Sequence, residues 1–312
     1  MTNHKNNTNT SNEELLVPVL SVGVQCEGGS GVEQCNVLLS GDLRKHKEYT
    51  EKVQIFTFDD FTLQPHDDHN KNGDDNTNKN DSLSLVDFMN KAKNDIEYPD
   101  MDISDPAVEN LHKQFLPIVQ QIMSSENGVY ASILRQQQNL YNREGFQIRP
   151  YAKPTYRYAS GHYAPYLHSD AWIPTADNND ESDHHPSKEE EKKDGDNSSP
   201  SSQYVALVNI WFVLNEEPPD NTLVFFETPS KNTCQSHMLH IRKEFVENRT
   251  IVYDKTMSWG KFYLFVSGEV NTSERVLLHG AMDVASHKND CQNEDDKNIR
   301  RSVEIRYTIH LT

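Results

Sequence analysis

Short runs of alternating apolar and polar residues dominate the second half of this chain. From residue 146 onward such runs recur between turn-forming Gly, Pro, Asn and Asp residues, and they are rich in Val, Ile, Phe and Tyr. A period of two is typical of strands with one buried face. The expected strands are Gln147–Arg149, Thr155–Tyr158, Tyr204–Leu214, Thr222–Phe226, Thr250–Tyr253, Lys261–Val266, Arg275–Leu278 and Ser302–Leu311. Upstream, Leu15–Val24 and Lys52–Phe58 predict two further strands.

The region before residue 146 has a helical period instead. Ser104 and Pro106 suit an N-cap and a first helical turn, and apolar residues then recur three or four positions apart from Val108 to Ile122. Pro117 is expected to kink this helix or to end its first half. A second helix is predicted at about residues 129–141.

Helices followed by many strands predict the α+β class. We expect helical support at about residues 100–145, packed on a double-sheet barrel at about residues 146–311. Residues 15–311 would then form a single domain. The polar residues 1–14 are expected to be a disordered leader.

Three polar tracts interrupt this pattern, at about residues 66–82, 175–203 and 287–298. They contribute −11 of the net charge of −18, and they help to explain a hydrophobic content of only 35%. We interpret them as surface insertions rather than parts of a site. The tract at 175–203 begins five residues after Asp170, so a role as a lid over a site is the alternative.

Composition and charge restrict the class of protein. An acidic chain without a basic stripe is a poor partner for nucleic acid, so a small-molecule substrate is expected. The N-terminal residues lack the apolar segment of a secretory signal, and Leu15–Val24 is too short to span a bilayer. The four Cys have neither zinc-site spacing nor the density of a disulfide scaffold. We therefore expect a cytoplasmic protein that does not act at a membrane, and the sequence leaves its oligomeric state open.

Two copies of the pattern His-x-Asp occur, and their surroundings differ. About one copy is expected by chance in a chain of this composition. His66 and Asp68 lie in a polar tract without apolar neighbours, whereas His168 and Asp170 end an aromatic stretch. With His279 further along the chain, the second copy supplies two imidazoles and one carboxylate, the set that holds Fe(II) on one face of an octahedron. We therefore predict a metal site at His168, Asp170 and His279.

A cation is the next requirement if the co-substrate is 2-oxoglutarate, because a planar Arg binds its distal carboxylate best. By strand alternation, Arg300, Ser302, Glu304 and Arg306 share one face of the last predicted strand, and Arg301 points to the other. Arg306 could bind a substrate carboxylate. An ion pair with Glu304 or another acid is the favoured interpretation.

The order of these elements resembles the phytanoyl-CoA dioxygenase-like superfamily of Fe(II)/2-oxoglutarate-dependent oxygenases. The resemblance covers roughly residues 151–311. The segments that carry it are Pro165–Asp170, Val208–Leu214, Asn221–Ser230, Trp259–Phe265, Leu278–Ala281 and Arg300–Arg306. It implies a double-stranded β-helix (cupin or jelly-roll) barrel that uses Fe(II), 2-oxoglutarate and O2.

Residue by residue, the resemblance implies that His168, Asp170 and His279 are the iron ligands and the catalytic centre. It implies Arg300 as the 2-oxoglutarate anchor, because that choice aligns the serine two places after the arginine. The segment between His279 and Arg300 is longer than in the family, so Arg301 stays the alternative anchor.

Asn209, Trp211 and Tyr156 are further candidates for the co-substrate pocket. Asn209 and Trp211 could line it, and a place in the barrel core is an equal alternative. Tyr156 and Tyr158 could contact 2-oxoglutarate or substrate, and simple packing is the favoured alternative.

The implied reaction oxidises a small molecule while 2-oxoglutarate is converted to succinate and CO2. Hydroxylation is the expected outcome, and Asp170 counts against halogenation because the halogenases of this superfamily replace that carboxylate with a small residue. Oxidative cyclisation or desaturation of an amino-acid-like specialised metabolite is an alternative with the same cofactors. A cupin metalloenzyme that does not use 2-oxoglutarate, or an inactive ligand-binding barrel, is a further alternative.

Overall fold

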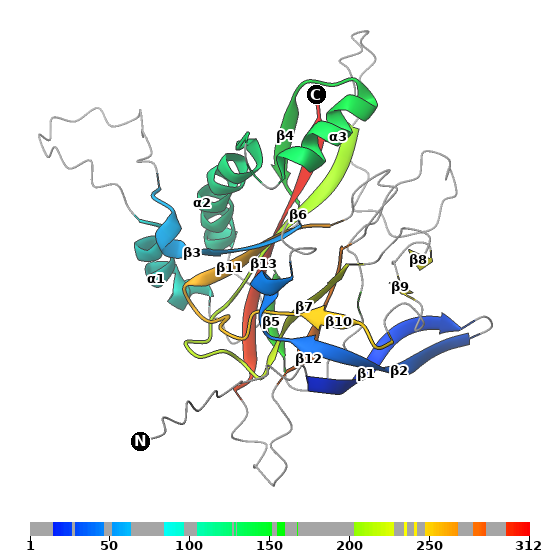
Figure 1. The fold of residues 1–312 in the computed structure, drawn as a ribbon. Helices are drawn as coiled ribbons and strands as arrows, with labels where there is room; N and C mark the ends of the chain where they lie inside the picture. Colours follow the sequence, from blue (N-terminus) through cyan, green and yellow to red (C-terminus); the bar gives the residue numbers. More distant parts are fainter. Residues whose placement is uncertain are drawn as a thin grey trace, which may run out of the picture.

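A computed structural model of the 312-residue chain describes most of the predicted strands and helices (Figure 1). The described residues are 15–26, 29–46, 52–63, 84–96, 105–126, 128, 130–151, 155–159, 167, 203–227, 234–235, 240–241, 247–267, 277–284 and 298–312. Most of them belong to two β-sheets and three α-helices.

The larger sheet has six strands and is built around the last strand, β13. Its order is β3, β11, β6, β13 and β4, while β5 pairs with the first half of β13 and β4 with the second half. Its strands are β3 Val53–Thr57, β4 Phe146–Pro150, β5 Thr155–Ala159, β6 Gln203–Val213, β11 Lys261–Ser267 and β13 Arg300–Leu311. All of these neighbours are antiparallel. Two 3-10 turns, η1 (Leu43–Lys45) and η3 (Phe58–Asp60), lie before and after β3.

The smaller sheet has five strands in the order β1, β2, β10, β7 and β12. Its strands are β1 Leu15–Cys26, β2 Gly29–Ser40, β7 Asn221–Glu227, β10 Thr250–Val252 and β12 Leu277–Asp283. Strands β2 and β10 are parallel, and the other neighbours are antiparallel. A separate ladder joins β8 (Cys234–Gln235) to β9 (His240–Ile241).

Alternation of side chains gives the larger sheet two different faces. One face packs against the helices and contains Val303 and Phe212. The other face contains Trp211, which belongs to the same buried cluster as Phe225 of the smaller sheet. The two sheets therefore face each other across an apolar interior, as in a jelly roll, and the chain is mostly β.

Three helices cover the outer face of the larger sheet: α1 (Leu85–Ile96), α2 (Asp105–Ser124) and α3 (Ala131–Tyr141). The predicted helical support is thus observed, although α1 was not expected from the sequence. Helix α2 is continuous across Pro117, so the proline does not end it. None of the described helices combines the length and the apolarity needed to cross a bilayer.

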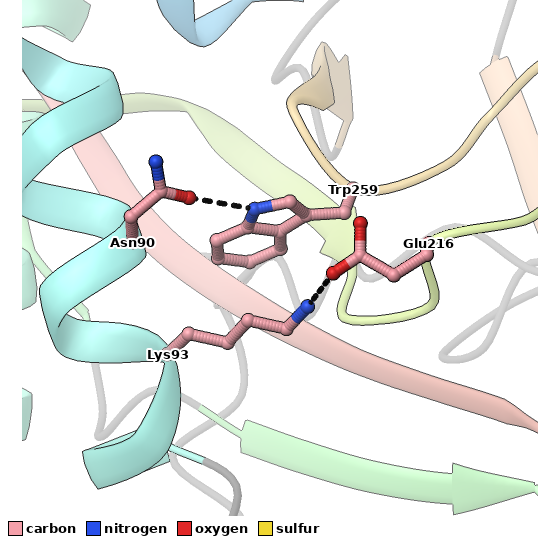
Figure 2. A network of polar contacts seen from close by, with 4 residues as sticks. All are labelled: Asn90, Lys93, Glu216 and Trp259. Carbon is pink, nitrogen blue, oxygen red and sulfur yellow. Dashed lines mark hydrogen bonds and ion pairs between the residues drawn. The ribbon is translucent and has the colours of Figure 1, made fainter.

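Helix α1 is held to the barrel by the indole of Trp259, which lies just before β11 (Figure 2). The indole Nε1 donates a hydrogen bond of 3.0 Å to Oδ1 of Asn90. The ammonium of Lys93 lies 4.6 Å from the centroid of the indole ring and forms an ion pair with Glu216. The indole also packs in a T-shaped arrangement against Phe58. One side chain thus joins a surface helix to the core.

We expect Trp259→Ala to lower the free energy of unfolding by roughly 2 to 3 kcal/mol, below the ~3–5 kcal/mol typical of a fully buried aromatic residue because Trp259 is only partly buried. Trp259→Phe keeps the ring contacts and loses the hydrogen bond to Asn90, so it should cost about 1 kcal/mol. Urea unfolding measures both changes. Tyr151→Ala is the matched control because Tyr151 is 48% exposed. An equal loss in the control would contradict this role of Trp259.

Candidate active site

The inner face of β13 carries a row of buried polar residues. Arg300, Ser302 and Glu304 are 3%, 1% and 7% exposed, and Arg306 continues the row. Arg301 lies on the opposite face and is only half-buried. The alternation predicted from the sequence is therefore confirmed. Polar groups buried in an otherwise apolar interior require partners or a ligand.

The guanidinium of Arg300 lies against the indole of Trp211, with its central carbon 5.8 Å from the ring centroid. Ser302, two residues along the same row, presents a buried hydroxyl oxygen that has no hydrogen-bond partner among the described residues. A planar cation beside a hydroxyl is a suitable donor set for a carboxylate. Trp211 therefore belongs both to the core and to the surroundings of Arg300.

His279 lies on β12, in the sheet opposite Arg300, and is 3% exposed. Its backbone pairs with that of Phe225 on β7. Its imidazole faces the interior, where the ring centroid lies 4.9 Å from that of Phe265 on β11. The structure thus places one of the predicted iron ligands between the two sheets.

A continuous series of aromatic ring contacts links His279 to Arg300. From the histidine it runs through Phe265, Phe225, Tyr263 and Trp211, and successive ring centroids lie 5.2, 5.0 and 5.6 Å apart. Packed rings have few alternative rotamers, so they hold the polar side chains at their two ends in place.

Tyr263 is the one phenol in this series, and its surroundings keep it neutral. Burial raises the pKa of Tyr263 well above the usual value for tyrosine. The phenolic oxygen accepts a hydrogen bond of 2.9 Å from the backbone N–H of Asp254. Tyr263 therefore adds no charge to the interior.

Asn209 lies fully buried in the middle of β6. Its backbone pairs with Phe265 on one side and with Arg306 on the other. The amide nitrogen donates to Oγ of Ser267 at 2.8 Å, and the amide oxygen has no hydrogen-bond partner among the described residues. In this orientation the amide oxygen of Asn209 is a hydrogen-bond acceptor in the interior. It lies at the level of His279, because His279 contacts Phe265 and the backbone of Phe265 pairs with Asn209.

Arg306 and Glu304 form an ion pair on the inner face of β13, with Nη2 2.8 Å from Oε2. The interpretation favoured from the sequence is confirmed. Glu304 is the more buried partner, with 8% of its side chain exposed against 24% for Arg306.

The long segment between His279 and Arg300 begins and ends at one residue, Asp220. The backbone N–H of Val284 donates to the carbonyl of Asp220 at 2.8 Å, and the N–H of Asp220 donates to the carbonyl of Asn298 at 3.2 Å. The Asp220 carboxylate also accepts the N–H of Asn298 at 3.0 Å. Val284 and Asn298, the described residues on either side of residues 285–297, are therefore joined through Asp220.

Asn215, at the end of β6, fixes the start of β13. Its amide nitrogen donates to the Asn298 side chain and to the carbonyl of Ile299, both at 2.8 Å, and its amide oxygen accepts the N–H of Arg301 at 2.8 Å. Sequence reasoning missed Asn215 and Asp220, because polar residues around Pro-Pro look like an ordinary solvated turn. The available signal was the Pro218–Asn221 turn between two predicted strands.

Two predicted site residues lie outside the described part of the chain. These are His168 and Asp170; the other His-x-Asp copy, His66 and Asp68, also lies outside it. Accordingly, no group of three metal-ligating side chains is found among the described residues. Of Tyr156 and Tyr158 only the backbone is described, and it pairs with Val303 and Arg301.

One described residue lies next to His168 in the chain. Leu167 is 1% exposed and belongs to the same buried cluster as Leu278, the residue before His279. The residues that immediately precede the two predicted histidine ligands therefore share one cluster on the smaller sheet.

No family model and no curated protein matches this sequence. Among solved structures, the chain is similar to the iron and alpha-ketoglutarate-dependent endoperoxidase NvfI. A variant of that protein is 10% identical, with 93% of this chain and 90% of that chain covered and a TM-score of 0.45. Two further structures of it give 10% and 9% identity, TM-scores of 0.44 and 0.41, and coverage of 97% and 95% of this chain and 93% and 95% of the other.

We expect that replacing residues 285–297 with Gly-Ser-Gly leaves the melting temperature within about 2 °C, because both ends of the segment are already joined at Asp220. Asp220→Ala should instead lower the free energy of unfolding by about 1 to 2 kcal/mol in either background, since it removes a charge-assisted hydrogen bond. Thermal and urea unfolding measure these effects. Loss of folding in the shortened chain would show that the segment itself supports the barrel.

Proposed function

We propose that this protein is an Fe(II)/2-oxoglutarate-dependent dioxygenase that oxidises a small molecule, with His168, Asp170 and His279 as iron ligands and Arg300 as the anchor of 2-oxoglutarate. We further propose that its two sheets form a double-stranded β-helix of the phytanoyl-CoA dioxygenase-like kind. The observation that carries the proposal is the placement of Arg300 and Ser302 in the interior, in the sheet opposite His279.

The described residues fit these cofactors. An imidazole is a ligand that iron commonly takes in proteins, and His279 is directed into the interior. The buried hydroxyl of Ser302, which has no hydrogen-bond partner among the described residues, lies two residues from the buried cation of Arg300 on the same face of β13, and the two together suit a carboxylate. The shared cluster of Leu167 and Leu278 supports the assignment of His168 and His279 to one site.

The contacts of Val284 and Asn298 with Asp220 support Arg300 as the anchor, although Arg300 is far from His279 in the sequence. Val284 lies five residues after His279, and Asn298 lies two before Arg300, and both contact Asp220. Between Arg300 and Arg301, burial favours Arg300, because a cation that is 3% exposed on the inner face is the one that a ligand between the sheets reaches.

When bound, Fe(II) and 2-oxoglutarate supply the oxidation, in which O2 converts 2-oxoglutarate to succinate and CO2 while the substrate is oxidised. Arg300 donates to the distal carboxylate, and Trp211 holds the guanidinium through its ring face. Asp170 and the two imidazoles carry the metal. The ring series keeps water from the interior, which strengthens the electrostatic contacts of both groups.

Hydroxylation is the proposed outcome, and cyclisation or desaturation would use the same residues. Product mass separates hydroxylation, which adds one oxygen, from ring closure and desaturation, which each remove two hydrogens.

Addition of Fe(II) and 2-oxoglutarate without oxygen should give a weak visible charge-transfer band. We expect His279→Ala and His168→Ala to abolish the band, because each removes an iron ligand. Arg300→Ala should raise the concentration of 2-oxoglutarate needed for half of the band by roughly 10- to 100-fold, as expected from losing charge-assisted hydrogen bonds of about 1.5–3 kcal/mol. Titration followed by absorbance is the measurement.

Arg301→Ala is the matched control, since Arg301 neighbours Arg300 and lies on the other face. It should leave the titration unchanged. If the wild-type protein gives no band, the oxygenase assignment is wrong. A band that depends on His279 but on neither arginine would favour a metalloenzyme that does not use 2-oxoglutarate.

A further inference from the structure

We propose that Arg306 and Glu304 together recognise a zwitterionic group on the substrate, in which a carboxylate and an ammonium lie on neighbouring atoms, as in an α-amino acid. This inference rests on the proposed function and names the substrate class of the same site. Arg306 would bind the carboxylate and Glu304 the ammonium.

The pair lies in the interior, at the level of the predicted metal site. The imidazole of His279 contacts Phe265, whose backbone pairs with Asn209, and Asn209 in turn pairs with Arg306. Two strand spacings, about 10 Å, separate Phe265 from Arg306 across the sheet. A small molecule held by Arg306 can therefore reach the neighbourhood of His279.

The backbones of Arg300 and Arg306 are six residues apart on one extended strand, which corresponds to about 20 Å. Arg300 is deeply buried, whereas 24% of the Arg306 side chain is exposed. The two cations suit two different carboxylates, one in the deep interior and one that enters nearer the surface.

Stability of the fold gives little reason to bury this ion pair. The desolvation of two charges offsets most of their attraction, so apolar residues at both positions would serve the barrel as well or better. The amide oxygen of Asn209, in register with Arg306, adds a buried acceptor without a partner among the described residues. The two charges of Arg306 and Glu304 and the amide oxygen of Asn209 lie in the same part of the interior. Together they indicate recognition of a polar ligand.

The presence of both charges favours a zwitterion over a simple anion or cation. An anion that bound Arg306 would be repelled by the carboxylate of Glu304, 2.8 Å from the guanidinium, and a cation at Glu304 would be repelled by Arg306. A neighbouring ammonium and carboxylate satisfy both groups at once. A guanidinium carries five N–H donors, and Arg306 contacts Glu304 through one of its terminal nitrogens, Nη2.

The test uses the full-length protein with Fe(II) and 2-oxoglutarate. The probes are the twenty common L-amino acids, each compared with the acid that lacks its amino group and the amine that lacks its carboxylate. We expect at least one amino acid to raise succinate release tenfold or more above both analogues, and to raise the melting temperature measured without oxygen. If no amino acid exceeds its analogues, or if an acid without the amine is preferred, the proposal is overturned.

Variants then assign the effect to the pair. Arg306→Gln and Glu304→Gln should each raise the half-saturating concentration of that amino acid by 10- to 100-fold, and Arg306→Lys should recover part of the loss. Arg301→Gln is the control and should match the wild type. Circular dichroism reports folding, and if Arg306→Gln does not fold, Arg306→Lys and Glu304→Gln carry the comparison. Unchanged half-saturation in the folded variants would overturn the proposal.

The charge-transfer band formed with Fe(II) and 2-oxoglutarate alone distinguishes failure of the proposed substrate class from failure of the proposed oxygenase function. A band without a response to amino acids contradicts only the role of Arg306 and Glu304. A missing band in the wild-type protein contradicts the oxygenase function itself.

Discussion

The fixed register of β13 is the constraint on which the rest of the structure depends. This strand is hydrogen-bonded along both edges, to β6 on one side and to β4 and β5 on the other. A slip by one residue would exchange its two faces, placing Val303 and Ile305 in the polar row and Arg300 and Glu304 under the helices. Burying those charges against α2 would be costly. The apolar layer beneath the helices therefore determines which side chains line the interior.

The interior itself combines rigid apolar packing with polar groups at separate levels. The rings of Phe265, Phe225, Tyr263 and Trp211 form its middle, with His279 and Arg300 at the two ends of their series. Such packing lowers the local dielectric constant, so each polar contact at its margins is stronger than it would be in water. The same packing limits how closely the side chains of His279 and Arg300 can approach each other. Chemistry that needs a cation and a metal ligand at a set separation suits this arrangement.

Period-two patterns predicted most of the barrel because they reflect burial directly. The last strand was expected at Ser302–Leu311 and is observed at Arg300–Leu311, and its two faces were assigned correctly. Strand β2, in contrast, was not predicted, since its Gly, Ser, Glu, Gln and Asn residues hide the few apolar ones. Helix α1 was missed because it directly follows a polar tract, although Ser84 and Asp87 form an N-terminal cap at its start.

The residues of the candidate site were likewise predicted only in part. The inward row of β13 and the Glu304–Arg306 ion pair followed from alternation and from charge. The contacts of Asn215 and Asp220 could not be foreseen, because they join segments about 80 residues apart through polar side chains that a sequence presents as surface. Which of two adjacent arginines faces the interior was settled by burial, whereas the ligand roles of His168, Asp170 and His279 remain predictions.

The closure at Asp220 also bears on how relatives of this chain can be recognised. Loop-closure entropy grows only slowly with length, so a segment whose two ends are pinned at one residue can lengthen or shrink with little effect on the barrel. Selection on the site then does not act on the number of residues between the histidine and the arginine. Patterns written with a fixed spacing would overlook such chains, whereas patterns written in terms of strand faces would find them.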